Sequence, residues 1–337
     1  MTGFYRSLLA TGAATLLAAV PAQSPNYHVT ARQLVGGEGS WDYITLDSRN
    51  HRLWITRGDH VQIINPATGK VDADIPGFKR AHGVAFAYDA GRAFATSGED
   101  STIRVIDLIS HKVVGMVPSQ VDDDGIVYDP SSNRVFSMNG DAHSMTIVNP
   151  MTATNVANVP LTGKPEFGVP DAAGHVYVNI EDAGDIDEVD IASQKVTRHW
   201  PMAPCKSPTG LAIDTQHHRL FSGCRSGVMA VSDAVAGKLV TTVPICQGVD
   251  ATRFDPATQL AFASCADGSI TVMHEDSPDK FTVVQTVKTM EGARTMELDP
   301  ATHTLYTAAA KSGPRPANGR GRAPMVPGTF TLLTLQR

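Results

Sequence analysis

Short runs of apolar and β-branched residues, separated by turn residues, fill most of the chain. Residues 43–47, 52–56, 61–65 and 70–75 are one example, with Gly, Pro, Asn and Asp in or between the runs. Runs of this length and composition predict strands, and beyond the N-terminal segment the chain lacks the period of an amphipathic helix. The pattern therefore predicts an all-β protein built from four-stranded meanders.

A turn motif recurs along the chain. It reads Asn-Pro-Ala-Thr-Gly-Lys from Asn65, and equivalent turns begin at Asp107, Asn149, Asp190, Asp233 and Glu275. Successive starts are 42, 42, 41, 43 and 42 residues apart. This is the period of a four-stranded propeller blade, with a solenoid as the competing repeat class.

Seven repeat units begin near residues 42, 82, 124, 166, 209, 250 and 294. The seventh unit stops after a third strand at residues 330–335, and residues 27–35 form a spare strand before the first unit. Joining these two segments in one sheet would remove exposed edges, which favours a ring over a solenoid. We therefore predict a single seven-bladed β-propeller over residues 24–337, with an N-terminal strand completing the last blade.

The N-terminal segment has the composition of a secretory signal. Arg6 precedes an apolar run over residues 8–20, and Pro21 and Ala22 follow. This order predicts a signal peptide over residues 1–22 and a periplasmic or secreted protein. The alternative is an N-terminal membrane anchor, although the run is shorter than the roughly 20 residues that a span requires.

The charge of the chain argues against nucleic-acid binding. The formal net charge is −6 and the isoelectric point is about 6.0. Since the sequence has no basic stripe to neutralise phosphates, we do not expect a nucleic-acid partner. We expect a monomer that binds a small molecule or a protein.

Four cysteines repeat with the same spacing in consecutive units. Cys205 and Cys224 flank the first two strands of the fifth unit, and Cys246 and Cys265 have the same positions in the sixth. Four cysteines allow three connectivities, and the ends of a hairpin favour pairing within each unit. Disulfides fit an oxidising compartment, and free thiols that bind a metal are the alternative.

Several segments resemble a known repeat family. They include Gly37–Asp42, His82–Ala85, Gly163–Phe167, Cys205–Asp214 and Gly292–Met296. With these motifs the mature chain resembles the YVTN-type β-propellers, and in particular their exported, YncE-like branch. The resemblance implies the fold and no single shared activity. The family often has Pro-x-Gly where the first strand begins, and only Pro208-Thr-Gly210 keeps that form.

One position in each unit is polar and differs between units. It lies five residues before the residue that ends the first strand, and its occupants are Asp42, His82, Asp124, Glu166, Thr209, Asp250 and Arg294. The first strand of a blade lines the axis of a propeller, so we expect these side chains to form a ring at one mouth of the central channel. The alternative is a wet channel mouth without a ligand.

The ring contains the residue types that bind divalent metals. Asp124, Glu166, Asp250 and His82 offer oxygen and nitrogen ligands that suit Ca²⁺, Mn²⁺ or Zn²⁺. Clustered carboxylates also repel one another, so a cation or a raised pKa would relieve them. We therefore consider a metal within the ring as one hypothesis.

A long loop interrupts the seventh unit over residues 311–328. It contains Arg315, Arg320 and Arg322 without a neighbouring acid. We expect it at the same mouth as the ring, where it would act as a cationic lid, and the alternative is an insertion without a function.

Familiar catalytic motifs are missing from the sequence. It contains no Cys-x-x-Cys-His for haem, no Gly-x-Ser-x-Gly and no His-Glu-x-x-His. Our leading hypothesis is an exported propeller that binds a small ligand in a polar axial funnel. The alternatives are a metal-assisted lactonase, hydrolase or lyase that uses the same site, and a protein-interaction scaffold.

Overall fold

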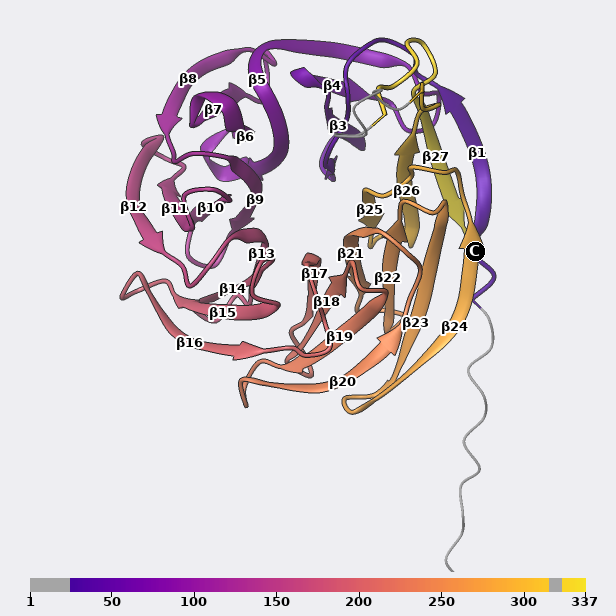
Figure 1. Cartoon of the computed structure of the whole chain (residues 1–337). Helices are drawn as coiled ribbons and strands as arrows, with labels where there is room; N and C mark the ends of the chain where they lie inside the picture. The colour runs from indigo at the N-terminus through magenta and orange to yellow at the C-terminus, as the bar shows by residue number, and fades with distance from the viewer. Residues whose placement is uncertain (1–24, 315–322) are drawn as a thin grey trace, which may run out of the picture.

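The computed structural model describes residues 25–314 and 323–337. The predicted signal peptide and the predicted lid residues Arg315, Arg320 and Arg322 lie outside these ranges. The described residues form 27 β-strands and two short 3₁₀ turns, and no α-helix occurs among them. The strands belong to six sheets of four or more strands that are arranged around a common axis (Figure 1). The prediction of an all-β, propeller-like fold is confirmed.

Four sheets each consist of four consecutive antiparallel strands. The first two sheets are β9 (Asp123–Asp129), β10 (Arg134–Asn139), β11 (Ser144–Asn149) and β12 (Thr154–Pro160), then β13 (Pro165–Pro170), β14 (His175–Ile180), β15 (Asp185–Asp190) and β16 (Lys195–Pro201). The next two are β17 (Pro208–Asp214), β18 (Arg219–Cys224), β19 (Val228–Asp233) and β20 (Lys238–Pro244), then β21 (Val249–Asp255), β22 (Leu260–Cys265), β23 (Ser269–Ser277) and β24 (Lys280–Lys288).

A seven-stranded sheet contains the first two repeat units. Its strands are β2 (Ile44–Asp47), β3 (Arg52–Thr56), β4 (Gly58–Ile64), β5 (Val71–Ala87), β6 (Arg92–Ser97), β7 (Thr102–Asp107) and β8 (Val113–Pro118). The 17-residue β5 pairs with β4 through its first part and with β6 through its last part. The sequence predicts two separate strands here. Instead, β5 stays paired with β4 at Pro76 and Ala81 although Gly77 and Arg80 have positive φ, so one irregular strand joins the two units.

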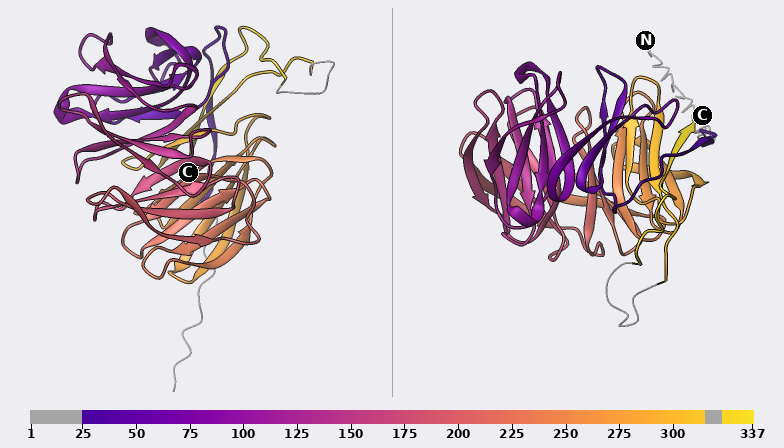
Figure 2. Two further views of the ribbon diagram at one scale, coloured as in Figure 1. Left: turned by 60° about the vertical axis from the view of Figure 1, so that its left-hand side comes forward. Right: turned by 90° about the horizontal axis from the view of Figure 1, so that it is seen from above.

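The N-terminal strand completes the last sheet. β1 (His28–Leu34) pairs antiparallel with β27 (Thr331–Gln336), which follows β26 (Thr304–Ala309) and β25 (Met296–Asp299). In Figure 1, β1 runs along the outer side of β27, and Figure 2 shows the same sheets from two further directions. The predicted pairing of the two ends of the chain is therefore confirmed.

The innermost strands of the sheets contact one another in chain order. β2, β5, β9, β13, β17, β21 and β25 each contact the next strand in this series, and β25 also contacts β2. Apolar side chains from neighbouring sheets pack together in the spaces between them, and this packing covers the faces of the sheets. The innermost strands therefore surround one common axis.

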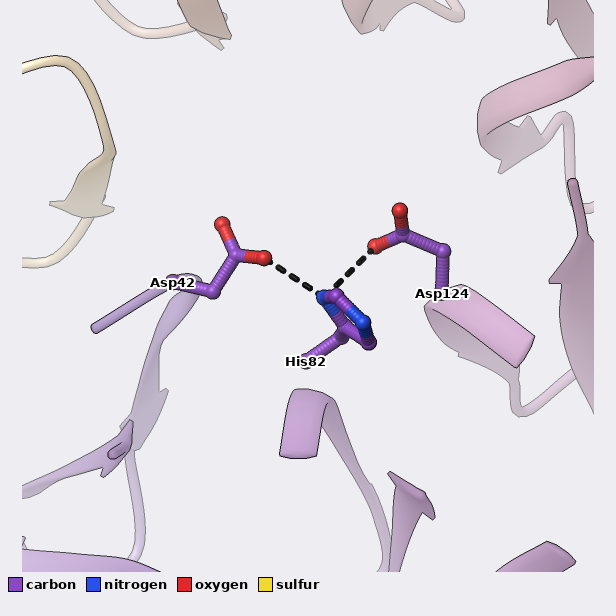
Figure 3. Close-up of side chains that lie close together, drawn as sticks. All are labelled: Asp42, His82 and Asp124. Carbon is purple, nitrogen blue, oxygen red and sulfur yellow. Dashed lines mark hydrogen bonds and ion pairs between the residues drawn. The ribbon is translucent and has the colours of Figure 1, made fainter. Parts of the chain in front are cut away.

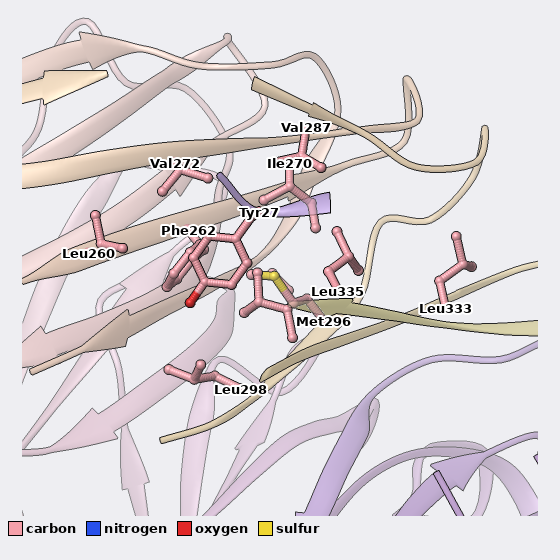
Figure 4. Close-up of a cluster of buried hydrophobic side chains, with 12 residues drawn as sticks. Tyr27, Leu260, Phe262, Ile270, Val272, Val287, Met296, Leu298, Leu333 and Leu335 are labelled. Atoms are coloured by element: carbon pink, nitrogen blue, oxygen red, sulfur yellow. The ribbon is translucent and has the colours of Figure 1, made fainter. Parts of the chain in front are cut away.

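Tyr27 anchors β1 in the core between the last two sheets (Figure 4). Its side chain is 1% exposed, and its ring meets the ring of Phe262 edge to face at 5.3 Å. The Tyr27 hydroxyl donates a hydrogen bond to the carbonyl oxygen of His303 at 2.8 Å. The N-terminal segment is thus held by apolar packing as well as by strand pairing.

Both cysteine pairs are formed within their sheets. Cys205 pairs with Cys224 and Cys246 with Cys265, with Cα–Cα separations of 5.5 and 5.9 Å. Each bridge joins a residue just before an innermost strand to the last residue of the next strand. The predicted connectivity is confirmed.

Replacing Tyr27 with Ala should destabilise the protein by about 3–5 kcal/mol, because the substitution leaves a cavity and removes a buried hydrogen bond. Chemical denaturation measures the loss. Leu34→Ala at the far end of β1 is the control, since Leu34 is 71% exposed and its replacement should cost little stability. Equal effects of the two substitutions would show that β1 is not anchored by its core residue.

Removing one disulfide, as in the Cys246→Ser/Cys265→Ser variant, should lower the unfolding free energy by about 2–4 kcal/mol. The cross-link restricts the unfolded chain, so its loss favours unfolding. Unfolding curves of this variant and of the wild type, each with and without reductant, measure the effect. Identical wild-type curves in both conditions would contradict a stabilising role.

Candidate functional site

Six of the seven predicted ring residues line one polar cavity of about 780 Å³, at the end of the axis where the innermost strands begin. They are Asp42, His82, Asp124, Glu166, Asp250 and Arg294. Thr209 does not join them. Its side chain is fully buried, and its hydroxyl lies within hydrogen-bond distance of the carbonyl oxygens of Val249 and Gly223. The Thr209 hydroxyl contacts the neighbouring backbone, so the structure does not place this predicted ligand-binding residue in the cavity.

His82 lies between two carboxyl groups from different strands (Figure 3). Its Nδ1 donates to Asp42 Oδ2 at 2.6 Å and lies 3.4 Å from Asp124 Oδ1. Burial opposes protonation of the ring, but the charge of Asp124 and the hydrogen bond to Asp42 outweigh it and raise the pKa of His82 to about 9. His82 is therefore a buried imidazolium at neutral pH.

Asp124 and Glu166 are the carboxyl groups of the ring that hold their protons most strongly. Burial raises the pKa of Asp124 to about 7, and the charges of Asp42 and Asp122 add to this while His82 opposes it. Burial and then the charge of Asp124 raise the pKa of Glu166 well above its usual value. The two groups interact, so each ionises less readily when the other is charged.

Two arginines each contact more than one carboxyl group of the cavity. Arg294 Nε lies 2.7 Å from Asp250 Oδ2, and Arg294 Nη2 lies 3.6 Å from Asp42 Oδ1. Arg225 Nη1 lies 2.7 Å from Glu181 Oε1, and its Nη2 lies 3.2 Å from Asp250 Oδ1 and 3.5 Å from Glu166 Oε1. The ring is therefore a network in which acids share a smaller number of cations.

Sequence reasoning missed Arg225, Glu181 and Lys164, which also line the cavity. None of them occupies the aligned position. Arg225 and Glu181 follow the second strand of their sheets, and Lys164 lies just before the first strand of its sheet. Lys164 Nζ lies 3.4 Å from Asp122 Oδ2, and Arg80 Nη1 lies 3.0 Å from Asp122 Oδ1. Alignment on the turns after second strands could have found Arg225 and Glu181, because both follow such a strand.

The loop between β26 and β27 reaches the same cavity. Lys311, Ser312 and Gly313 on one side, and Ala323 and Met325 on the other, contribute to its lining. Ser312 and Met325 form an isolated bridge. The loop therefore leaves the sheet at the face of the polar cavity, as predicted, whereas its three predicted arginines lie outside the described residues.

The predicted metal set is not gathered around one point. Of Asp124, Glu166, Asp250 and His82, only Asp124 and His82 belong to a compact group, and the third member of that group is Asp42. Glu166 and Asp250 instead contact Arg225. At Asp42, His82 and Asp124, the pKa of His82 is raised to about 9, so removal of its proton for metal binding is costly at neutral pH.

A second, apolar cavity of about 460 Å³ lies further along the inner strands. Its lining includes Phe86, Tyr128 and Phe254, and Tyr43 contributes to both cavities. The rings of Tyr43 and Phe167 pack at 5.4 Å. The polar cavity therefore has an aromatic residue in its wall toward the centre of the molecule.

No family model and no curated protein matches this chain. In the part of the chain that the structure describes, no helix is long and apolar enough to cross a membrane. Among solved structures, the chain is similar to Kuenenia stuttgartiensis hydrazine synthase, with a TM-score of 0.69 and 13% sequence identity. The match covers 87% of this chain and 95% of that chain. At this identity the likeness supports the propeller-like fold alone, and the resemblance to YVTN-type repeats stays a prediction.

Proposed function

We propose that this protein binds a small organic cation, such as a primary amine, in the polar cavity. The observation that carries the proposal is the pair Asp124 and Glu166. Among the described residues, their ion-pair contacts are long, 3.4 Å from Asp124 to His82 and 3.5 Å from Glu166 to Arg225. Both cations have a closer partner, because His82 binds Asp42 at 2.6 Å and Arg225 binds Glu181 at 2.7 Å. Asp124 and Glu166 are therefore the least neutralised carboxyls of the ring.

A protonated amine suits this pair of carboxyl groups. An ammonium group has three donors and one positive charge, and charge-assisted hydrogen bonds are the strongest that a small polar ligand can form. Asp124 Oδ1 has no hydrogen-bond partner among the described residues, so it is free to accept one. The volume of the polar cavity is in the range of small-molecule sites.

We also propose that the fold is a closed, seven-bladed propeller of the YVTN type and that the protein is exported. The seven innermost strands and the contact of β25 with β2 support the ring. In this view β5 belongs to two blades, and β1 completes the last one. The two disulfides support an oxidising compartment, and the apolar N-terminal sequence supports export.

Calorimetric titration with 1,4-diaminobutane and with L-lysine tests the proposed function. Asp124→Asn and Glu166→Gln should each weaken binding by about tenfold or more, because each removes a charged acceptor. Asp89→Asn is the matched control, since Asp89 is 80% exposed and lies outside the cavity. Neutral N-acetylated analogues should not bind. Equal affinity of the amines and their acetylated forms would contradict the proposal.

Binding of the amine should also depend on pH. The pKa of Asp124 is raised to about 7, so the carboxyl is protonated below that pH and ionised above it. The affinity should therefore be highest above pH 7 and fall by up to about tenfold for each unit below it. The Asp124→Asn variant should lose this dependence in part. Affinity that rises on acidification would oppose the assignment.

A second candidate is acid–base catalysis in the same cavity. It is favoured by the raised pKa of Asp124, which holds a proton near neutral pH beside the imidazolium of His82. Lactone or ester hydrolysis that is lost in Asp124→Asn, with or without added divalent metal, would establish this activity. Amine binding without turnover of these substrates would leave the binding function alone.

A further inference from the structure

A second compact group of metal-ligating side chains lies at the opposite ends of the inner strands from the polar cavity. Asp214 ends β17, His217 lies in the turn after it, and Glu275 lies near the end of β23 in the next sheet. His217 Nδ1 lies 2.7 Å from Asp214 Oδ2 and 3.1 Å from Glu275 Oε1. The side chains of Asp214 and Glu275 are each only 1% exposed.

The two buried carboxylates are not satisfied by the one imidazole nitrogen. A single Nδ1–H cannot donate to both acids with good geometry. Glu275 Oε2 is buried without a hydrogen-bond partner among residues 25–314 and 323–337, and Asp214 Oδ2 has only its contact with His217. Burying an unpartnered carboxylate oxygen is costly, so the group has the chemistry of a site that a cation would complete.

The neighbouring arginine has other partners. Arg219 Nη1 lies 3.2 Å from Asp233 Oδ2, and its Nη2 lies 3.0 Å from Asp279 Oδ1. Arg219 Nε donates to the carbonyl oxygen of Pro278 at 2.6 Å. The guanidinium thus donates to a different set of acceptors, and its charge acts on Glu275 only by opposing the rise in the pKa of that carboxyl.

We propose that Asp214, His217 and Glu275 form a Zn²⁺ site that links the β17–β20 sheet to the β21–β24 sheet. The ligand atoms of the three residues all lie within 4.8 Å of one another. Zinc bonds to nitrogen and oxygen of about 2.0–2.2 Å in a tetrahedron put neighbouring ligand atoms about 3.4 Å apart. The observed 2.7 and 3.1 Å therefore need only a small outward movement. Water would supply the fourth ligand.

Other Asp–His pairs at this face show what is special about the group. His175 Nδ1 lies 2.9 Å from Asp171 Oδ2, and His303 Nδ1 lies 2.7 Å from Asp255 Oδ2. Neither pair belongs to a compact group of three metal-ligating side chains in the described chain. Asp255 Oδ2 also accepts a hydrogen bond from the Thr258 hydroxyl. Glu275 therefore turns a structural Asp–His contact into a three-ligand set.

Zinc titration of chelator-treated protein tests the site. Calorimetry with ZnSO₄ should show binding that is weakened at least 100-fold in His217→Ala and in Glu275→Gln. It should be unchanged in His303→Ala, the matched Asp–His control, and in His82→Ala, which removes the group in the polar cavity. Zinc at 100 times its dissociation constant should raise the midpoint of thermal unfolding of the wild type by about 5 °C.

Two further measurements keep the result unambiguous. Co²⁺ in place of zinc should give the visible absorption of a tetrahedral site in the wild type and in His303→Ala, and not in Glu275→Gln. Circular dichroism of the metal-free variants should match that of the wild type, which shows that they fold. Zinc affinity that survives in folded His217→Ala and Glu275→Gln, or that is lost only in His82→Ala, would overturn the proposal.

Discussion

Packing between neighbouring sheets fixes where the polar groups of this protein can lie. Each innermost strand contacts the next along the chain, so residues at the same level of successive strands approach one axial volume. Acids placed at this position are brought together although they are about 40 residues apart in the sequence. They lose hydration and repel one another, which raises the pKa of Asp124 and Glu166. The chemistry of the cavity follows from this constraint.

The repeat made much of the fold and part of the site predictable. Turn spacing located the strands. The incomplete seventh unit indicated that the N-terminal strand pairs with β27, and the equal positions of the cysteines in two units indicated both disulfides. The continuous β5 was not predicted, because the alternation does not show that strand pairing resumes after the irregular residues Gly77 and Arg80. Six ring positions reached the cavity, whereas Thr209 satisfies backbone carbonyls instead.

Ion pairing within the site could not be read from the repeat. Glu166 and Asp250 of the predicted metal set contact Arg225 instead of joining His82 and Asp124 in one compact group. Arg225 lies at a position that the alignment of first strands does not cover. The same limit applies at the other end of the strands. The distance between His217 and Glu275 depends on how two sheets pack, so spacing within one unit cannot reveal it.

The ionisation of Asp124 and Glu166 links the fold to the proposed binding of a cation. Carbon-13 NMR of the side-chain carboxyl groups, assigned with Asp124→Asn and Glu166→Gln, follows each group directly through a pH titration. Asp124 should titrate near pH 7 in the free protein, and its midpoint should fall when 1,4-diaminobutane is added. A midpoint below about pH 5 that the amine does not move would contradict both the electrostatics of the cavity and its proposed ligand.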